Sequence, residues 1–299
     1  MDVAISGANG FIGSALSASL RADGHRVLRL IRGGVTGGDA IGWDPDAGRI
    51  DAPALEGLDA VVHLAGAGIG DRRWTAEQKR IIRESRVRGT AVLAGAVASR
   101  ERKPAVFVSG SAIGYYGNRG DEVLTERSAP GADFLSQVCV AWEAETQPVA
   151  DAGVRTVLTR TGIVLDAGGG ALARMLVPFK LGIGGRQGSG QQWMSWITLA
   201  DHVGAIRHAI AHVSVEGPTN LVAPNPVTNT DFARTLGQAL HRPTIFPTPL
   251  LPLKLRFGSE LVEALLLASQ RVTPAQLTAT GYEFTGPSLD VALQAMFKG

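Results

Sequence analysis

The stretch SGSAIGYYG at residues 109–117 ends an apolar run of the sequence, and three of its hydroxyl side chains, Ser111, Tyr115 and Tyr116, could do chemistry. Ser111 could hold a substrate oxygen, and Tyr115 or Tyr116 could exchange a proton with that oxygen if a nearby cation lowered the pKa of the phenol. Both tyrosines could equally pack as aromatic side chains. We treat these three residues as the candidate catalytic groups.

A glycine-rich turn near the start of the chain, ISGANGFIG at residues 5–13, has the spacing of a phosphate-binding loop. Its first glycine permits a tight turn, the second lets backbone N–H groups approach a diphosphate, and the third allows a helix to pack against a strand. An ordinary turn before a helix is the alternative. The turn predicts a dinucleotide site, and the loop residues expected to bind it are Gly7, Asn9, Gly10, Phe11, Ile12 and Gly13.

The next apolar run, RVLRLIRGG at residues 26–34, indicates which dinucleotide binds. A carboxylate at the end of this strand would bind the ribose of NAD, whereas an arginine would bind the additional phosphate of NADP. The run ends in Ile31 and Arg32 without an acidic residue, and a guanidinium can make paired hydrogen bonds to a phosphate. We therefore expect NADP or NADPH, with these two residues beside it. The alternative for Arg32 is an ordinary exposed arginine.

Apolar runs of strand length alternate with helix-compatible segments through the first half of the chain. This alternation predicts an α/β fold, a Rossmann-type doubly wound parallel sheet covered by helices on both faces. The expected strands are residues 2–7, 26–32, 58–66, 105–110 and 155–165. The expected helices are residues 11–22, about 75–99 and 134–153.

The composition of the sequence changes near residue 166, where glycine-rich loops and closely spaced prolines begin. We expect a cofactor-binding domain at residues 1–165 and a smaller C-terminal α/β lobe at residues 166–299 that binds substrate. In this lobe we expect an apolar helix at residues 260–269 and a short strand around residues 281–286.

The G-x-x-G-x-x-G spacing of the first loop resembles the extended, nucleotide-sugar-epimerase-like branch of the short-chain dehydrogenase/reductase superfamily. Stretches such as GYYG, SRVRGT, FLSQVCVAWE, GSGQQWMSWITLAD and NLVAPNPVTN resemble an atypical epimerase-like family of this branch, which ends in a small domain of unknown function. The resemblance covers nearly the whole chain. It implies a Rossmann fold and NADP binding.

The resemblance also implies further cofactor-binding residues. HLAG matches an element at the end of the third strand, SRVRGT places an arginine where other members carry an asparagine, and TRTGIVL matches a segment that passes the nicotinamide. The alternatives are buried strand ends and a solvated helix arginine. The residues implied are Leu64, Ala65, Gly66, Arg86, Ser109, Gly162 and Ile163.

The superfamily's catalytic Tyr-x-x-x-Lys pair is absent from this sequence. If Glu143 is the acid that usually follows the lysine, Leu135 and Cys139 stand where the tyrosine and lysine would be. A shift by one residue gives Phe134 and Val138 instead. The usual proton shuttle is therefore missing, and Ser111 remains as the match to the superfamily's serine.

The stretch PFKLGIGGRQGSGQQWMSWI at residues 178–197 combines polar and aromatic side chains with flexible glycine backbone, as a substrate pocket requires. From it we expect Lys180, Gln192 and Trp193 to bind substrate. The alternative for Trp193 is a core position in the smaller lobe.

Composition excludes several classes of protein. The formal net charge is only +2, so nucleic-acid binding has no support, and no apolar run is long enough to cross a membrane. A single cysteine and the absence of a signal-like N-terminus favour the cytoplasm. The helical spacing of His202, His208 and His212 lacks an acidic partner for zinc, and we expect no metal.

Two functions remain at this point. The first is an NADP-dependent oxidoreductase or nucleotide-sugar-epimerase-like enzyme acting on a small hydroxyl or carbonyl substrate, with a homodimer as one assembly. The second is a catalytically weakened NADPH-binding regulatory or sensor protein. Loss of the Tyr-x-x-x-Lys pair favours the second, whereas the retained serine and tyrosines favour the first.

Overall fold

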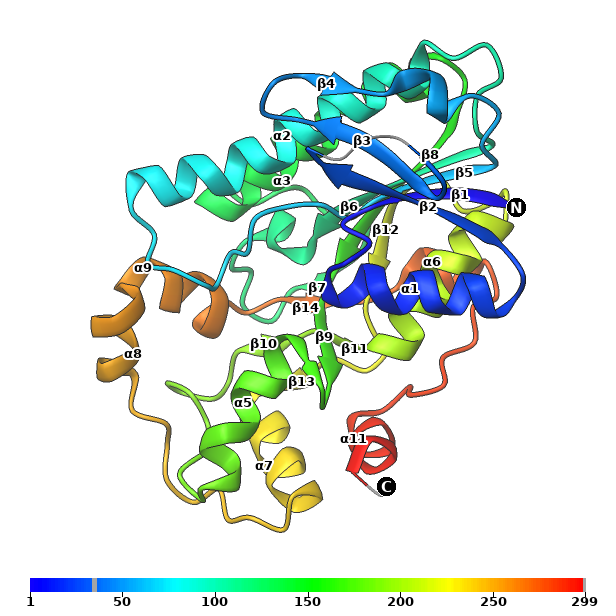
Figure 1. Ribbon diagram of the computed structural model, residues 1–299. Helices are drawn as coiled ribbons and strands as arrows, with labels where there is room; N and C mark the ends of the chain where they lie inside the picture. The colour runs from blue at the N-terminus through cyan, green and yellow to red at the C-terminus, as the bar shows by residue number, and fades with distance from the viewer. Residues whose placement is uncertain (34–36, 298–299) are drawn as a thin grey trace.

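The computed structural model describes residues 1–33 and 37–297, and its main sheet has eight strands in the order β12-β8-β6-β5-β1-β2-β3-β4 (Figure 1). All neighbouring strands run parallel except β3 and β4. The predicted α/β fold with a doubly wound parallel sheet is confirmed. The strands are β1 (Asp2–Ser6), β2 (Arg26–Arg32), β3 (Ala40–Asp44), β4 (Arg49–Ile50), β5 (Ala60–His63), β6 (Val106–Ala112), β8 (Arg155–Thr161) and β12 (Gly217–Leu221).

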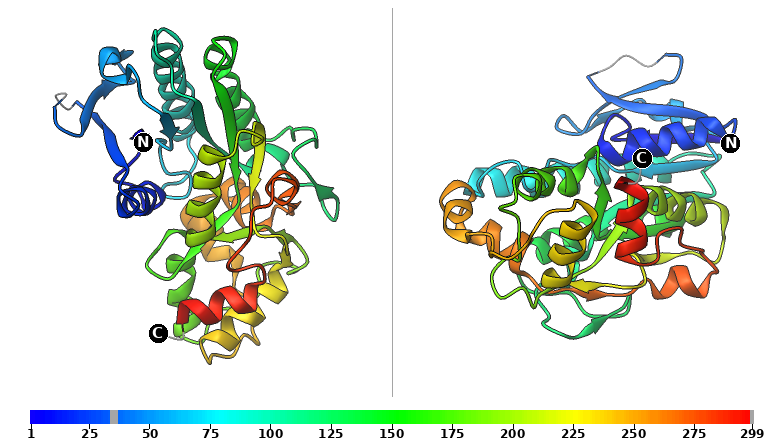
Figure 2. Two further views of the ribbon diagram at one scale, coloured as in Figure 1. Left: turned by 90° about the vertical axis from the view of Figure 1, so that its right-hand side faces the viewer. Right: turned by 90° about the horizontal axis from the view of Figure 1, so that it is seen from below.

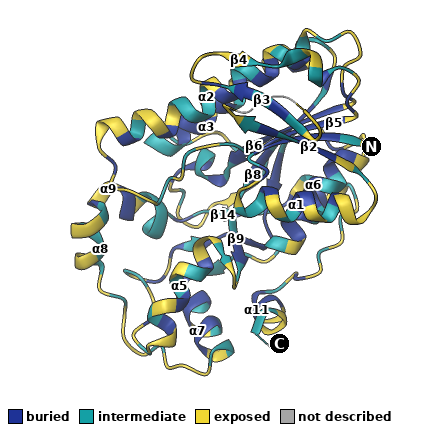
Figure 3. Ribbon diagram, in the orientation of Figure 1, coloured by how far each residue is buried: buried dark blue, intermediate teal, exposed yellow. Residues whose placement is uncertain are grey.

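Helices cover both faces of this sheet because its central strands bury alternate residues on opposite faces. Val3 and Ile5 of β1 pack against α1 and α6, whereas Ala4 packs toward the face covered by α2 and α4. Figure 3 shows the resulting buried layer between the helices. The covering helices are α1 (Phe11–Ala22), α2 (Ala76–Ala98), α3 (Phe134–Ala144), α4 (Gln147–Asp151) and α6 (Leu199–Ala211).

Two expected elements are each divided in two. The strand expected at residues 155–165 breaks at Gly162 into β8 and β9 (Ile163–Asp166), because β9 leaves the main sheet to pair with β11 (Trp196–Thr198). The helix expected at residues 134–153 ends at Ala144 and restarts as α4, whose first turn contains Pro148. Proline lacks a backbone N–H and is tolerated at the start of a helix, not in its interior.

The chain leaves the main sheet near the expected boundary at residue 166 and later returns to it. Helix α6 covers one face of the sheet, and β12 pairs with β8 at its edge. Most of the remaining C-terminal elements lie in the lower part of Figure 1, where α11 packs beside α7 (Figure 2), whereas α10 packs against β12 at the edge of the main sheet. The remaining elements are α5 (Gly170–Lys180), β10 (Trp193–Met194), β13 (Val227–Thr228), α7 (Asn229–Ala239), α8 (Leu250–Phe257), α9 (Ser259–Val262), α10 (Ala275–Ala279) and α11 (Leu289–Phe297).

Of two expectations for the C-terminal part, the helix is present with a change of helix type, and the strand was wrong. The apolar helix expected at residues 260–269 is the short α9 followed by a π-helical segment, η3 (Glu263–Leu267). The segment at residues 281–286 forms no strand. Its backbone N–H groups at Thr285 and Gly286 donate instead to the buried carboxylate of Asp201 on α6, so a side chain replaces the partner strand.

Four short elements lie around the ends of the main strands. The 3₁₀ turn η2 (Ile113–Tyr116) follows β6 directly, and β7 (Val123–Leu124) pairs with β14 (Arg271–Val272). A further 3₁₀ turn, η1 (Ala52–Leu55), precedes β5. The β7–β14 pair joins the loop that follows the candidate catalytic stretch to the C-terminal part of the chain.

Candidate functional site

The glycine loop between β1 and α1 has the close backbone contacts that its spacing predicts. Gly7 has a φ of +70°, which favours glycine, and a Cβ atom on Gly13 would overlap the carbonyl oxygen of Gly7. No side chain caps α1 at Gly10, so the first N–H groups of the helix remain available to an anion. The loop therefore has the geometry to hold a diphosphate, and Asn9, Phe11 and Ile12 lie within it.

The end of β5 lies against this loop and is held in place by Ser6. The Ser6 hydroxyl accepts hydrogen bonds from the backbone N–H groups of Leu64 (3.1 Å) and Ala65 (3.2 Å). A Cβ on Gly7 would lie 3.0 Å from backbone atoms of these same two residues. The predicted residues Leu64 and Ala65 thus form one continuous cradle with the glycine loop.

His63 supports the cradle from inside the sheet. Its Nδ1 lies 2.6 Å from the Ser6 hydroxyl, and burial, with Arg86 nearby, lowers the pKa of His63 to about 4. The ring is therefore neutral at pH 7, as expected of a core histidine. Sequence reasoning did not identify Ser6, whose role depends on backbone groups more than fifty residues away.

Ile31 and Arg32 end β2, the strand next to β1. Arg32 is exposed and forms no ion pair with the part of the chain that the structure describes. Its guanidinium lies at the end of β2, and no carboxylate of the described residues neutralises its charge.

Ser111, Glu143 and Arg160 form a hydrogen-bonded group at the carboxyl end of β6. The Ser111 hydroxyl donates to Glu143 Oε1 over 2.6 Å. Arg160 on β8 donates to the same carboxylate through Nε (2.9 Å) and Nη2 (2.8 Å). Ser111 is thus fixed by a buried, charged acceptor.

The two tyrosines lie on the other side of Arg160. Tyr116 is fully buried, donates to Asn220 Oδ1 over 2.6 Å and accepts from Arg160 Nη1 over 3.2 Å. Burial raises the pKa of Tyr116 to about 12, so its phenol stays protonated. The ring of Tyr115 stacks on the guanidinium, with Arg160 Cζ 3.4 Å from its centroid.

Leu135 and Cys139 lie beside the turn that follows Ser111, where the missing tyrosine and lysine would stand. A Cβ on Gly114 would be 3.3 Å from Leu135 Cβ and 4.0 Å from Cys139 Sγ. Burial raises the pKa of the Cys139 thiol to about 12. Neither side chain can therefore exchange a proton at neutral pH.

Arg86 reaches from α2 to the segment that follows β5. Its Nη1 donates to the carbonyl oxygens of Ala67 (3.0 Å) and Ile82 (3.0 Å). A Cβ on Gly66 would lie 3.3 Å from Arg86 Cζ. The predicted pair Gly66 and Arg86 is therefore in contact at the edge of the cradle.

The remaining predicted cofactor residues lie within the sheet and at its end. Ser109 is fully buried in β6, and its carbonyl accepts from Thr159 Oγ1 over 3.0 Å. Gly162 separates β8 from β9, and a Cβ there would lie 2.7 Å from the Ser195 carbonyl oxygen. Ile163 follows it in β9 and donates its backbone N–H to that same oxygen.

The structure does not bring the three predicted substrate residues together. Gln192 is buried and donates to the carbonyls of Gln187 and Leu266, so it ties loop backbone together. Trp193 donates to Asp121 from its indole nitrogen. Lys180 is exposed at the last turn of α5.

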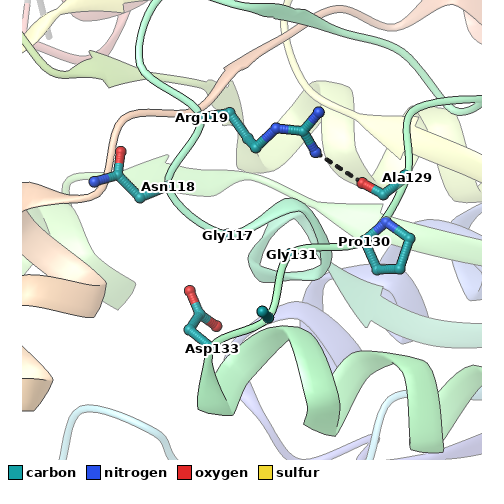
Figure 4. Close-up of a pocket in the computed structure, with 8 residues that line it drawn as sticks. Gly117, Asn118, Arg119, Ala129, Pro130, Gly131 and Asp133 are labelled. Carbon is teal, nitrogen blue, oxygen red and sulfur yellow. Dashed lines mark hydrogen bonds between the residues drawn. The ribbon is translucent and has the colours of Figure 1, made fainter.

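An open pocket of about 560 Å³ lies beside η2 and the start of α3 (Figure 4). Arg119 forms part of its wall and donates to the carbonyl of Ala129 over 3.0 Å. None of the site residues predicted from the sequence lines this pocket. Its lining residues are Gly117, Asn118, Arg119, Ala129, Pro130, Gly131, Ala132 and Asp133.

The three histidines noted in the sequence do not converge on one point. His202 is buried beside Thr161, whereas His208 and His212 stack on each other. Across residues 1–33 and 37–297, no group of three or more His, Cys, Asp or Glu side chains could hold a metal ion. In the same residues, no helix is both long and apolar enough to cross a membrane.

Sequence reasoning missed the residues that hold Ser111 and Tyr116, namely Glu143, Arg160 and Asn220. Glu143 is the one charged residue of α3, and Arg160 is the last residue but one of β8, which is paired on both sides. A charged residue at each of these inward positions was the available signal, because such charges are rarely buried without a partner.

Comparisons with known proteins agree with this geometry. Residues 3–222 match the model of the NAD dependent epimerase/dehydratase family, and residues 248–296 match a domain of unknown function, DUF1731. An epimerase family protein of Mycobacterium bovis is 44% identical over 291 residues, which cover 97% of this chain and 96% of that protein. The human epimerase family protein SDR39U1 is 38% identical over 301 residues, which cover 98% of this chain and 99% of that protein.

Two solved structures are similar over the whole of this chain. The crystal structure of human SDR39U1 (isoform 2) with NADPH has a TM-score of 0.91 at 35% identity and is itself covered completely. The nucleoside-diphosphate sugar epimerase of Corynebacterium glutamicum has a TM-score of 0.82 at 36% identity, with 58% of that chain covered. The resemblance seen in the sequence is confirmed: the chain belongs to the NAD-dependent epimerase/dehydratase family, with a C-terminal domain of unknown function.

Proposed function

We propose that this protein is an NADPH-dependent oxidoreductase or epimerase-like enzyme that acts on a small hydroxyl or carbonyl compound in the cytoplasm. The observation that carries the proposal is the Ser111 hydroxyl, fixed 2.6 Å from a buried carboxylate at the carboxyl end of β6. In open parallel sheets, ligands bind outside the carboxyl ends of the strands. The glycine loop follows β1, so it lies at the same edge of the sheet, with β5 between β1 and β6.

The residues of the cradle are suited to NADPH. The free N–H groups at the start of α1 would hold its diphosphate, and the exposed Arg32 would hold its adenosine phosphate. Leu64, Ala65 and Gly66 would line its path along the end of β5. The relative solved with NADPH supports this choice of cofactor. When bound, NADPH supplies a hydride to a carbonyl group, and NADP⁺ accepts one from a hydroxyl-bearing carbon.

Ser111 would orient the reacting oxygen and link it to Glu143. Because the Ser111 proton already points to Glu143, its oxygen can accept a hydrogen bond from a substrate hydroxyl. As that hydroxyl is oxidised, its proton would pass to Ser111 while the Ser111 proton passes to Glu143 Oε1. Reduction of a carbonyl would run the same transfers in reverse. The relay takes the place of the missing tyrosine and lysine.

The test combines cofactor binding with turnover. We expect calorimetry to detect NADPH binding, and absorbance at 340 nm to fall when NADPH is mixed with a suitable aldehyde, quinone, oxo acid or nucleotide sugar. Ser111→Ala should bind NADPH as the unchanged protein does and lose about 100-fold or more in turnover. Turnover that survives this substitution would overturn the role given to Ser111.

Leu135 and Cys139, which stand where the family's tyrosine and lysine would be, support a second candidate, an NADPH-binding regulatory protein. The Cys139 thiol, whose pKa burial raises to about 12, offers no proton where the family lysine would stand. NADPH binding without turnover of any compound in the panel would favour this candidate.

A further inference from the structure

Arg86 is a cation that the fold leaves without a carboxylate partner. The side chain is partly buried, and it forms no ion pair with any Asp or Glu of residues 1–33 and 37–297. Its Nη1 donates two hydrogen bonds, to the neutral carbonyl groups of Ala67 and Ile82. Removing a charge from water is costly unless an opposite charge compensates it. The surroundings of Arg86 therefore favour an anion.

The donors that Arg86 leaves unused have the arrangement of a carboxylate fork. Nε and Nη2 donate to no atom of the described residues, and their N–H bonds point the same way from one edge of the guanidinium. Two parallel N–H donors match the two oxygens of a carboxylate. Arg160 uses these same two nitrogens to bind Glu143. One arginine of the site thus already binds a carboxylate in this way.

Arg86 lies close to the reacting group of the proposed function. Its guanidinium is 5.1 Å from the ring centroid of Trp142, which packs over Gly110 of β6. The Cys139 thiol is close enough to both Arg86 and Ser111 for each to lower its pKa against the larger effect of burial. Arg86 and Ser111 are therefore neighbours of the same thiol, on the side of β6 where Ser111 meets Glu143.

We propose that Arg86 binds a carboxylate of the substrate through Nε and Nη2, so that the substrate is a small hydroxy acid or oxo acid. This inference rests on the proposed function, because it places the carboxylate beside the oxygen that Ser111 orients. The neutral Nη1 contacts with Ala67 and Ile82 hold the guanidinium in position. A neutral sugar or quinone would leave the charge of Arg86 unpaired.

Direct binding tests the proposal without requiring turnover. The NADPH-loaded protein is titrated by calorimetry or ligand-observed NMR with glycolate, lactate, 3-hydroxybutyrate and glucuronate, each compared with its own amide. We expect at least one acid to bind about tenfold more tightly than its amide, because removal of one partner from a desolvated charge pair costs at least this much. If no acid is preferred over its amide, the proposal is overturned.

Substitutions then assign the preference to Arg86. Arg86→Met removes the charge, Arg86→Lys keeps the charge but not the fork, and Arg83→Met changes an exposed arginine of the same helix as a control. The first two should abolish the preference for the acid, whereas the control should retain it. A preference that survives in both Arg86 variants overturns the proposal.

NADPH affinity separates this inference from the proposed function. The sequence predicts Arg86 at the cofactor, so NADPH affinity decides between that role and the one proposed here: if Arg86 binds the substrate, Arg86→Met binds NADPH within about threefold of the unchanged protein. A loss of about tenfold or more would place Arg86 in the cofactor site and overturn the inference. Failure of the unchanged protein to bind NADPH would overturn the proposed function itself.

Discussion

Glu143 on α3 and Arg160 on β8 form a two-point ion pair inside the protein, with Nε 2.9 Å from Oε1 and Nη2 2.8 Å from Oε2. Their side chains are only 10% and 3% exposed. The pair also binds two residues of the candidate catalytic stretch, since Ser111 donates to the carboxylate and Tyr116 accepts from the guanidinium. The position of both hydroxyls therefore depends on this one pair.

Glu143→Gln should lower the free energy of unfolding by about 3–5 kcal/mol, because it leaves the buried guanidinium without a counter-charge. Urea denaturation followed by circular dichroism measures the change. The control is Glu77→Gln, which breaks an exposed ion pair with Arg80 and should lower the free energy of unfolding by less than about 1 kcal/mol.

The double variant Glu143→Leu with Arg160→Met removes both charges and should be more stable than Glu143→Gln alone. If the single and double variants unfold at the same urea concentration, the pair does not have the energetic role inferred from its burial.

Gly13→Ala should weaken NADPH binding by about tenfold or more, because the added Cβ would force the carbonyl of Gly7 and the glycine loop to move. Calorimetry with NADPH measures the loss. Gly95→Ala, on an exposed position of α2 with open space around it, is the matched control. It should leave binding unchanged and stabilise the helix by about 0.5–1 kcal/mol.

The backbone geometry of the glycine loop could be predicted because local spacing determines it. The contacts of Gly7, Gly10 and Gly13 follow from a turn of fixed length, which the residue order reveals directly. The fold could also be predicted from the sequence, because alternating strands and helices leave few arrangements other than a parallel sheet.

Contacts between segments that are distant in the sequence could not be predicted from local spacing. Tyr116 meets Asn220, a residue 104 positions away, only because β12 returns to the sheet beside β8. Gly162 was read as part of a continuous strand, since nothing in its neighbours signals that the Ser195 carbonyl will approach it. Lys180 and Gln192 were grouped by closeness in sequence, whereas the structure exposes Lys180 and buries Gln192 against the carbonyls of Gln187 and Leu266.

Arg32→Met should reduce the preference for NADPH over NADH. The exposed guanidinium at the end of β2 would lose its contact with the additional phosphate of NADPH, which NADH lacks. We expect affinity for NADPH to fall about tenfold or more and affinity for NADH to stay within about twofold. Arg49→Met, at the exposed edge strand β4, is the control and should change neither affinity. Equal loss of both affinities would mean that Arg32 does not select the phosphate.

Two buried histidines should make the protein less stable as the pH falls below about 6.5. Burial lowers the pKa of both His63 and His202 to about 4, and Arg86 contributes at His63. In the unfolded chain each would accept a proton near pH 6.5, so between pH 6.5 and 4 the unfolded state binds more protons than the folded state. Stability is therefore complete above pH 6.5 and is lost as the pH approaches 4.

The contribution of one histidine can be measured by the slope of stability against pH. His202→Gln retains a polar group toward Thr161 and removes one titrating site. The free energy of unfolding between pH 6.5 and 4.5 should then fall less steeply, by up to about 1.4 kcal/mol per pH unit. An unchanged slope would show that His202 titrates alike in the folded and unfolded chain.

Asp201 should control whether the segment at residues 282–286 stays attached to α6. Its carboxylate accepts from the backbone N–H groups of Thr285 (2.8 Å) and Gly286 (2.9 Å) and from the Thr285 hydroxyl (2.8 Å), while Tyr282 donates to its carbonyl. Asp201→Ala keeps the carbonyl that accepts from Tyr282 but removes the acceptor of the Thr285 and Gly286 donors. Thr285 is exposed and can turn to water, whereas the buried Gly286 N–H is left without a partner, at a cost of about 1–3 kcal/mol.

The loss should be local, because the segment has no strand partner to replace the carboxylate. Hydrogen exchange measured by mass spectrometry should show faster exchange in peptides that contain residues 282–297, with the peptides of β1 and β6 unchanged. Asp290→Asn, an exposed position on α11, is the control and should leave these rates as they are. Uniformly faster exchange across the chain would instead indicate that Asp201 stabilises the whole fold and not this attachment.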